Sequence, residues 1–355
     1  MTNTDRKNVL IYISSLGGGG AERVACRLAN ELSKRHRVYL MYFVHKETSY
    51  YVNSKVTKIE FSIRFRNWCP SKLRGWYGLL YQIAAVTLAR YKYKIDISIS
   101  FMDLMNLVNV LAFGARRKIV SDRNDPANKT KNHMKASLYA HRFADYAVFQ
   151  THKAQHMYPE KVWKKSCVIP NPTEVTCSVS ACRLKKIATV GRLHKQKNQK
   201  MLIVAFTSFH KLHPDYHLYI YGEGDLLNEL MLHAENCGIS DFVHFEGFKE
   251  DVHAAIADAE QFVLTSDYEG MSNALMEAMM MGHSCISTSC NGSDELIEDG
   301  INGLLVPVGD ADALCAAMCR LSDDPELRKK LGKAAAISAE KWSTEQVVRL
   351  WEKIL

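Results

Sequence analysis

Short apolar runs alternate with longer stretches of helical periodicity almost throughout the chain. In the first half the expected strands are Val9–Ile13, Val38–Phe43, Ile95–Ser100, Lys118–Ser121 and Tyr146–Phe149. The expected helices between them are Ala21–Lys34, Leu73–Arg90, Leu104–Phe113 and Lys131–Phe143. Strands that alternate with helices in this way form parallel sheets covered by those helices, so the pattern predicts an α/β fold.

The run Ile169-Pro170-Asn171-Pro172-Thr173 cannot be helical, because each proline fixes its own backbone and restrains the residue before it. We interpret it as the end of a first domain. A second alternation follows, with strands expected at Lys186–Val190, His217–Tyr221, Phe242–Phe245, Gln261–Thr265 and Cys285–Thr288. The chain therefore predicts two doubly wound parallel-sheet domains that meet at a cleft. Ligands of such sheets bind beyond the carboxyl ends of the strands.

Composition supports a folded, two-domain protein of 355 residues without a membrane span. No signal peptide is recognisable, and the longest uncharged stretch, residues 75–89, is shorter than the roughly 20 residues that a spanning helix needs. None of the ten cysteines forms a C-x-x-C pair, so we expect reduced cysteines in the cytoplasm and no metal site.

The net charge of +8 is unevenly distributed along the chain. Residues 1–172 contain 29 Lys and Arg against 11 Asp and Glu, whereas residues 173–355 contain 17 against 27. The basic first half suggests an anionic partner: nucleic acid, phospholipid or a diphosphate-linked substrate. Because no nucleic-acid-binding motif is present, we expect no nucleic-acid partner.

The glycine-rich segment LGGGGAER at residues 16–23 follows the first strand and opens a helix. Glycines allow backbone amides to approach a phosphate, and a helix start favours an anion, so Gly19 and Gly20 are candidate phosphate contacts. A dinucleotide fingerprint is absent, and no acidic residue ends the next strand, which disfavours a nicotinamide dehydrogenase. A tight turn without a ligand remains the alternative.

Three further strand-end loops lie in the second half. In GRLHKQKN, at residues 191–198, Arg192 and Lys197 flank a helix start that Asn198 can cap, which suits a diphosphate. The alternative is a solvated basic loop. The loop YGEGD at residues 221–225 is expected to act mainly through its backbone.

The fourth loop, SDYEGMSNALMEA at residues 266–278, carries the strongest signal. Glu269 is expected at a strand end, and Ser272 or Asn273 can cap the apolar helix that follows. Glu277 within this buried helix costs several kcal/mol unless its carboxylate is satisfied. Sugar or ribose hydroxyls would satisfy it, whereas pairing with a lysine or the backbone is the structural alternative. The segment from Met271 to Leu275 would offer amides to a phosphate.

These motifs resemble retaining glycosyltransferase family 4, which has the GT-B fold. EGMSNALMEAM resembles the family's E-x₇-E motif, and VGRL…K at residues 190–197 and YGEG at 221–224 also match. The opening SLGGGGAERV and DELIEDGINGLLVP at residues 294–307 extend the resemblance over almost the whole chain. The resemblance implies two Rossmann-like domains, 1–173 for the acceptor and 174–341 for the nucleotide sugar. It also implies that the last helix, within 342–355, crosses back to the first domain.

Residue roles follow from the resemblance. Glu277 would hold ribose hydroxyls, Glu269 would place the donor sugar, and Arg192 with Lys197 would neutralise the diphosphate leaving group. The remaining donor-side residues implied by the resemblance are Gly19, Gly20, Phe248 near the base, Gly270, Met271, Ser272, Asn273, Ala274 and Leu275. The family needs no metal or other cofactor, and front-face attack requires no enzymic nucleophile.

One departure from the family concerns the acceptor side, where SDRNDP at residues 121–126 replaces a segment in which many members carry a histidine. This version resembles the branch that adds hexoses or N-acetylhexosamines to lipid-linked or surface saccharides. It suggests UDP-N-acetylgalactosamine as donor and a polyprenyl-diphosphate-linked acceptor. Asp122 and Arg123 can meet the acceptor, or they can form a helix cap and a surface ion pair.

The segment RFRNWCPSKLRGWYGLLY, at residues 64–81, mixes basic and aromatic residues beside an uncharged helix. Such a mixture suits peripheral contact with an anionic membrane at the inner face of the cytoplasmic membrane, although an amphipathic core helix with a basic rim explains it equally. A non-catalytic sugar-nucleotide sensor remains an alternative function, and a nucleic-acid-binding protein would leave the buried glutamates unexplained.

Overall fold

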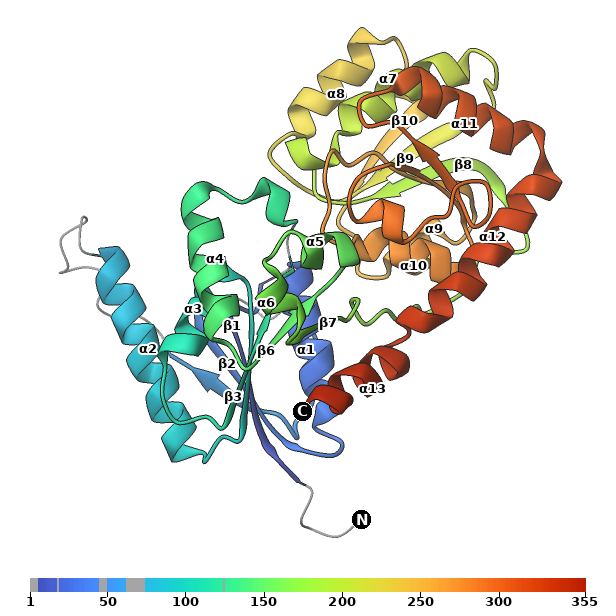
Figure 1. The fold of residues 1–355 in the computed structure, drawn as a ribbon. Helices are drawn as coiled ribbons and strands as arrows, with labels where there is room; N and C mark the ends of the chain where they lie inside the picture. The colour runs from blue at the N-terminus through green and yellow to red at the C-terminus, as the bar shows by residue number, and fades with distance from the viewer. Residues whose placement is uncertain (1–5, 18, 45–49, 62–73, 124) are drawn as a thin grey trace. The chain divides into compact units, whose positions relative to one another are not determined.

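The computed structural model describes residues 6–17, 19–44, 50–61, 74–123 and 125–355 (Figure 1). The chain divides into two compact units: unit 1 contains residues up to Pro172 together with Thr344–Leu355, and unit 2 contains Thr173–Ser343. The boundary between the units therefore falls in the proline-containing run, within one residue of the position expected from the sequence.

Unit 1 is built on a seven-stranded sheet with the order β3-β2-β1-β4-β5-β6-β7, in which every pairing is parallel. Its strands are β1 (Asn8–Ser15), β2 (Arg37–Val44), β3 (Thr57–Glu60), β4 (Ile97–Phe101), β5 (Arg117–Ser121), β6 (Tyr146–Phe149) and β7 (Ser166–Val168). The central strands are nearly continuous apolar runs because both faces of a parallel sheet are covered. The two edge strands, β3 and β7, were not predicted, since each is very short and only partly buried.

Helices cover both faces of this sheet (Figure 1). On one face α1 (Gly20–Leu32) and α13 (Thr344–Ile354) share a core with alternate residues of β1, and on the other α2 (Arg74–Lys92) and α3 (Asp103–Leu111) share a second core with the intervening β1 residues. The remaining helices of unit 1 are η2 (Pro126–Asn128), α4 (Lys131–Phe143), α5 (His152–His156) and α6 (Glu160–Trp163). The expected return of the last helix to the first domain matches the assignment of α13 to unit 1.

Unit 2 contains a six-stranded parallel sheet with the order β10-β9-β8-β11-β12-β13. Its strands are β8 (Leu184–Val190), β9 (His217–Tyr221), β10 (Val243–Gly247), β11 (Ala259–Leu264), β12 (Ser284–Thr288) and β13 (Leu304–Val306). Its helices are η3 (Lys195–Lys197), α7 (Gln199–His210), α8 (Leu227–Asn236), η4 (Ser240–Phe242), α9 (Val252–Ile256), α10 (Asn273–Met281), η5 (Ser293–Glu295), α11 (Ala311–Asp323), α12 (Pro325–Ala339) and η6 (Glu340–Trp342).

Trp342 corrects one predicted boundary. The sequence pattern places this residue in the returning helix, but in the structure it lies at the end of η6 and is buried in the core of unit 2. Ala335 and Ala339 of α12 belong to the same core, so the chain remains attached to unit 2 through Trp342. The returning helix begins two residues later, at Thr344.

Each sheet has a point where successive crossovers turn in opposite directions. In unit 2 the chain leaves β8 towards β9 but leaves β11 towards β12, so a crevice is expected beyond the carboxyl ends of β8 and β11. In unit 1 the corresponding strands are β1 and β4. These two positions are where parallel α/β sheets bind ligands, and the candidate loops of the sequence analysis follow β8, β11 and β1. The expected cleft between the two sheets stays a prediction.

Candidate functional site

An ion pair between Lys197 and Glu269 lies at the switch point of unit 2. The ammonium of Lys197, at the end of η3, contacts Oε1 of Glu269, and both side chains are largely buried. Ser266 Oγ donates to the same carboxylate oxygen at 2.7 Å. The sequence pattern predicts Glu269 at the strand end. In the structure it lies five residues beyond the last residue of β11. The structure thus brings together two of the predicted catalytic residues.

The two loops that carry this pair are joined by hydrogen bonds. The backbone N–H of Asp267 donates to the carbonyl of Gln196 at 2.9 Å, and the Gln196 amide donates to the carbonyl of Tyr268 at 2.8 Å. Asn198 Nδ2 donates to Asp267 Oδ1 at 2.7 Å. Asn198 also adopts a left-handed backbone and caps α7, which ends the basic loop as predicted. The ion pair is therefore held by a rigid frame.

Glycines of neighbouring strand ends complete this frame. A Cβ on Gly222, whose φ is +131°, would lie 2.1 Å from the carbonyl oxygen of Gly191. A Cβ on Gly224 would lie 2.3 Å from the carbonyl oxygen of Leu193. The YGEG segment thus packs backbone against backbone beneath the loop of Arg192, which is the structural role expected for it.

Glu277 lies on α10 and is buried, as its position in an apolar helix predicted. Ser272 caps this helix by accepting from the backbone N–H of Leu275, and Gly282 ends it in a left-handed conformation. The amides of Asn273 and Ala274 belong to the first turn, where no earlier helical carbonyl is available to them. This end of α10 is suited to an anion, as the sequence analysis expected for residues 270–275.

An ionisable group that faces Glu277 is His253 on α9, a residue that the sequence motifs do not single out. His253 Nε2 lies 3.4 Å from Glu277 Oε2. The two residues are far apart in the sequence, and His253 lies in a short apolar helix that offers no local signal. By contrast, Ser266 stands three residues before Glu269 in the strongest loop and could have been proposed from that spacing.

Two predicted donor-side residues remain exposed to solvent. Arg192 follows β8 in the same loop as Lys197, and Phe248, with 72% of its surface exposed, follows β10. Both lie at the carboxyl ends of strands, but in the described part of the chain neither side chain forms a hydrogen bond or ion pair with Lys197 or Glu269. Their predicted roles towards diphosphate and base stay predictions.

Gly19 and Gly20 stand at the start of α1 in unit 1. Gly19 precedes the helix with an extended backbone, and Gly20 is its first residue. A Cβ on Gly19 would lie 2.1 Å from the carboxylate of Glu22, so a larger residue would require that side chain to move. The turn is consistent with a close backbone approach, and phosphate contact stays a prediction.

Asp122 follows β5 and belongs to a buried polar cluster of unit 1. Its carboxylate accepts hydrogen bonds from Lys129 and, at 2.6 Å, from the hydroxyl of Tyr158. Lys129 also pairs with Asp103 at 2.6 Å. Burial alone would raise the pKa of Asp122, but the neighbouring ammonium and the hydrogen bonds hold it below its ordinary value. The alternative prediction, that Asp122 forms an ion pair at the surface, is wrong, because its ion pair with Lys129 is buried.

Arg123 is also buried, with its guanidinium between aromatic rings and the end of unit 1. Nη1 donates to Asn171 Oδ1 at 3.0 Å and to the Ile169 carbonyl at 3.3 Å. The guanidinium lies over the rings of Phe101 and Trp351. Burial lowers the pKa of this group to about 9. In this arrangement Arg123 connects parts of unit 1, and an acceptor contact stays a prediction.

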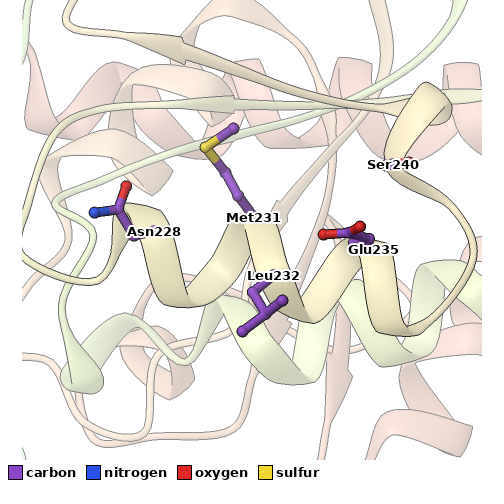
Figure 2. Close-up of a pocket in the computed structure, with 5 residues that line it drawn as sticks. All are labelled: Asn228, Met231, Leu232, Glu235 and Ser240. Atoms are coloured by element: carbon purple, nitrogen blue, oxygen red, sulfur yellow. The ribbon is translucent and has the colours of Figure 1, made fainter.

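The structure also has a shallow depression beside α8, lined by Asn228, Met231, Leu232, Glu235 and Ser240 (Figure 2). It contains none of the predicted site residues, and its lining includes exposed apolar side chains rather than groups suited to a diphosphate. Among the residues that the structure describes, no cluster of three or more His, Cys, Asp and Glu side chains could hold a metal ion.

With the Lys197–Glu269 pair and α10 in place, comparison with known proteins identifies the chain. Residues 180–337, which carry the whole of this arrangement, match the family described as glycosyl transferases group 1. The chain therefore contains a group 1 glycosyltransferase domain. This confirms the resemblance recognised in the sequence motifs.

Two relatives of this glycosyltransferase, both from Campylobacter jejuni, match nearly its full length. One is a GalNAc-α-(1→4)-GalNAc-α-(1→3)-diNAcBac-PP-undecaprenol α-1,4-N-acetyl-D-galactosaminyltransferase, 29% identical, with 98% of each chain covered. The other is an N-acetylgalactosamine-N,N'-diacetylbacillosaminyl-diphospho-undecaprenol 4-α-N-acetylgalactosaminyltransferase, 26% identical, with 96% of each chain covered.

Solved structures confirm the GT-B fold of this glycosyltransferase. Anabaena Alr3699/HepE in complex with UDP aligns with a TM-score of 0.82 at 18% identity, over 98% of this chain and 99% of that one. Sucrose-phosphate synthase from Thermosynechococcus elongatus aligns with a TM-score of 0.85 at 17% identity, over 98% of both chains. At these identities the likeness establishes the architecture, two Rossmann-like units with parallel sheets.

Proposed function

We propose that this glycosyltransferase moves a hexose or N-acetylhexosamine from a UDP-sugar to a lipid-linked saccharide, with retention of the anomeric configuration and without a metal. The observation that carries this proposal is the Lys197–Glu269 pair at the switch point of unit 2. A cation beside the start of α10 suits a diphosphate, and a fixed carboxylate suits sugar hydroxyls.

The chemistry assigned to these residues follows from their charges. As the bond between the anomeric carbon and the diphosphate oxygen breaks, negative charge grows on the leaving group. Lys197 and Arg192 stabilise that charge, which lowers the barrier because the interaction is strongest in the transition state. Glu269 orients the sugar through its hydroxyls, and Glu277 binds the ribose. The acceptor hydroxyl attacks from the same face and transfers its proton to the departing diphosphate.

The proposed substrates rest on the relatives. The two Campylobacter enzymes are named for transfer of N-acetylgalactosamine to undecaprenyl-diphosphate saccharides, and the Anabaena structure contains UDP. UDP-N-acetylgalactosamine is therefore the proposed donor. The excess of basic residues in positions 1–172 suits an acceptor that carries a diphosphate. We place the reaction at the inner face of the cytoplasmic membrane, where such an acceptor and a nucleotide sugar can meet.

Helix α2 supplies a surface for this membrane contact. Its large exposed apolar side chains are Trp76, Tyr77, Leu80, Leu88 and Tyr91. At about 100° per residue these five positions fall within an arc of roughly 120°, while the opposite side of the helix faces the core. The helix contains no acidic residue and ends with the exposed Lys92, whereas the guanidinium of Arg90 is buried in unit 1. Gly114 lies against the ring of Tyr91, and the preceding residue, Phe113, is also exposed.

This face differs from the segment originally predicted for membrane contact. Of residues 64–81, positions 64–73 lie outside the described residues, and the structure instead extends the exposed face along α2 towards Tyr91. No helix in the described part of the chain is long and apolar enough to cross a bilayer. A helix with one exposed apolar face and a basic residue at its end is suited to lie along a lipid surface rather than through it.

Thermal unfolding with nucleotides tests the proposed function. A ligand that binds only the folded state stabilises it by about 2.7 kcal/mol at a hundredfold excess over its dissociation constant. We expect UDP and UDP-N-acetylgalactosamine to raise the midpoint, GDP and NAD to leave it unchanged, and Glu277→Ala to abolish the shift. Turnover of UDP-N-acetylgalactosamine with an undecaprenyl-diphosphate saccharide then separates a transferase from a sugar-nucleotide sensor. Absence of any nucleotide effect on the folded wild type would contradict the proposal.

A further inference from the structure

Two buried side chains of unit 2, His253 on α9 and Glu277 on α10, face each other. His253 Nε2 lies 3.4 Å from Glu277 Oε2, and the side chains are only 9% and 5% exposed. A buried carboxylate is stabilised by a nearby donor, because its charge is poorly solvated. The position of His253 therefore bears directly on how the carboxylate of Glu277 is held.

Contacts on the other side of the ring determine which nitrogen carries the proton. The backbone N–H of Thr176 points at His253 Nδ1 from 3.2 Å. A backbone N–H can only donate, so Nδ1 accepts, and the neutral ring must carry its proton on Nε2. This is the nitrogen that faces Glu277.

Asp251 strengthens this arrangement. The hydroxyl of Thr176 donates to Asp251 Oδ1 at 3.3 Å, and the same oxygen accepts from the backbone N–H of Ala254 at 3.1 Å, which caps α9. Thr176 and the helix that carries His253 are thereby tied to the same carboxylate. Because Asp251 holds both Thr176 and the helix of His253, the orientation of the imidazole ring is fixed.

We propose that His253 is a positioning residue for substrate binding: its Nε2–H lies beside Glu277 Oε2 and, through this electrostatic contact, sets the rotation of the carboxylate that binds the ribose. The inference rests on the proposed function, in which Glu277 is the ribose-binding group. An N–H held against one oxygen of a carboxylate restricts the rotation of the group, so that the other oxygen keeps a fixed direction towards a ribose hydroxyl. Such preorganisation strengthens binding because less freedom is lost when the ligand arrives.

Ribose discrimination tests this role directly. Calorimetric dissociation constants would be measured for UDP, 2'-deoxy-UDP and 3'-deoxy-UDP with the wild type, Glu277→Gln, His253→Leu and His253→Gln. The wild type should prefer UDP over at least one deoxy analogue by about tenfold, the effect of one hydrogen bond to a charged group. His253→Leu should reduce that preference to about twofold or less. His253→Gln, whose amide can donate from a similar position, should retain most of it.

A matched control comes from His283, a fully buried histidine of the same unit that lies beyond the end of α10. His283→Gln should lower the unfolding midpoint but keep the wild-type preference for UDP, since a merely structural role affects all three nucleotides equally. Nitrogen NMR of the imidazole gives an independent readout that needs no variant. It should show the proton of His253 on Nε2.

The outcomes separate the two proposals. If the folded wild type binds none of the three uridine nucleotides, both the proposed function and the role of His253 are wrong. If the wild type discriminates through Glu277 but folded His253→Leu discriminates equally well, only the positioning role is overturned. A proton on Nδ1 in the NMR spectrum would also overturn it, whatever the variants do.

Discussion

The guanidinium of Arg123 lies over the ring of Trp351, with 5.7 Å between its Cζ atom and the ring centroid. Arg123 follows β5, whereas Trp351 belongs to α13 at the end of the chain, and the two meet in unit 1. Because Arg123 also donates to Ile169 and Asn171, one side chain connects the last helix with the segment that leaves unit 1. The last helix is thus an integral part of the first unit.

Trp351→Ala should destabilise unit 1. The side chain is fully buried beside Phe101 and within the core that α1 and α13 share, so its removal leaves a large cavity. A loss of about 3–5 kcal/mol in the free energy of unfolding is expected from such a truncation. Denaturant unfolding measures it. Trp76→Ala on the exposed face of α2 is the control and should change stability little; equal losses in both variants would contradict the packing role.

Removing either member of the Lys197–Glu269 pair should impair transfer. Lys197→Ala removes the cation proposed for the diphosphate, and a decrease of about 10²–10³-fold in kcat is expected from the loss of one such group. Glu269→Gln should also reduce kcat, since it keeps the shape but not the charge. Steady-state kinetics with the cognate donor measures both. Lys200→Ala, which breaks an exposed ion pair with Glu229 on neighbouring helices, is the control and should keep wild-type turnover.

Gly292→Ala should disturb the loop of Glu269 from behind. A Cβ at this position would lie 2.4 Å from the carbonyl oxygen of Gly270, and backbone cannot yield as a flexible side chain can. We expect a rise in KM for the donor together with a fall in kcat, as the loop moves by a fraction of an ångström. Gly78→Ala in α2 meets nothing within 4 Å and should be neutral or stabilising by about 0.5–1 kcal/mol. An unaltered KM for the donor sugar in Gly292→Ala would contradict this prediction, because it would show that the loop of Glu269 accommodates the added methyl group.

The Asp122–Lys129 cluster predicts an acid-dependent loss of stability. Because the pKa of Asp122 is lower in the folded protein than its ordinary value of 3.8, the unfolded chain binds the proton more readily. The resulting stabilisation is fully present above about pH 5, declines as the pH falls through the ordinary value, and disappears below the folded pKa. Unfolding free energies measured from pH 6 downwards should therefore fall more steeply for wild type than for Asp122→Asn. Parallel curves for the two proteins would exclude the contribution.

The exposed face of α2 predicts binding to anionic vesicles. A double variant Trp76→Ser/Leu80→Ser should lose most of the binding seen with vesicles that contain phosphatidylglycerol, because it removes two large apolar groups from one face. Binding should also weaken as salt rises, since the exposed Lys92 at the end of the helix contributes electrostatically. Vesicle sedimentation measures both effects. Leu212→Ser, an exposed leucine of unit 2, is the control, and a similar loss in that variant would contradict a dedicated face.

The sequence by itself determined the fold class and most of the secondary structure. Buried parallel strands are apolar along their whole length, and turns and caps such as Asn198 and Gly282 act locally, so both leave a signal in neighbouring residues. The resemblance of the motifs to a glycosyltransferase family also pointed to Lys197, Glu269 and Glu277. The short edge strands β3 and β7 left no such signal, because few of their residues are buried.

Only the tertiary structure decided which side chains meet. Lys197 and Glu269 are brought together because β8 and β11 are neighbours in the sheet, and His253 reaches Glu277 because α9 packs beside α10. Burial likewise turned Asp122 and Arg123 from exposed candidates into parts of a packed interior. Contacts between residues distant in the chain depend on strand order and packing, which local periodicity does not encode.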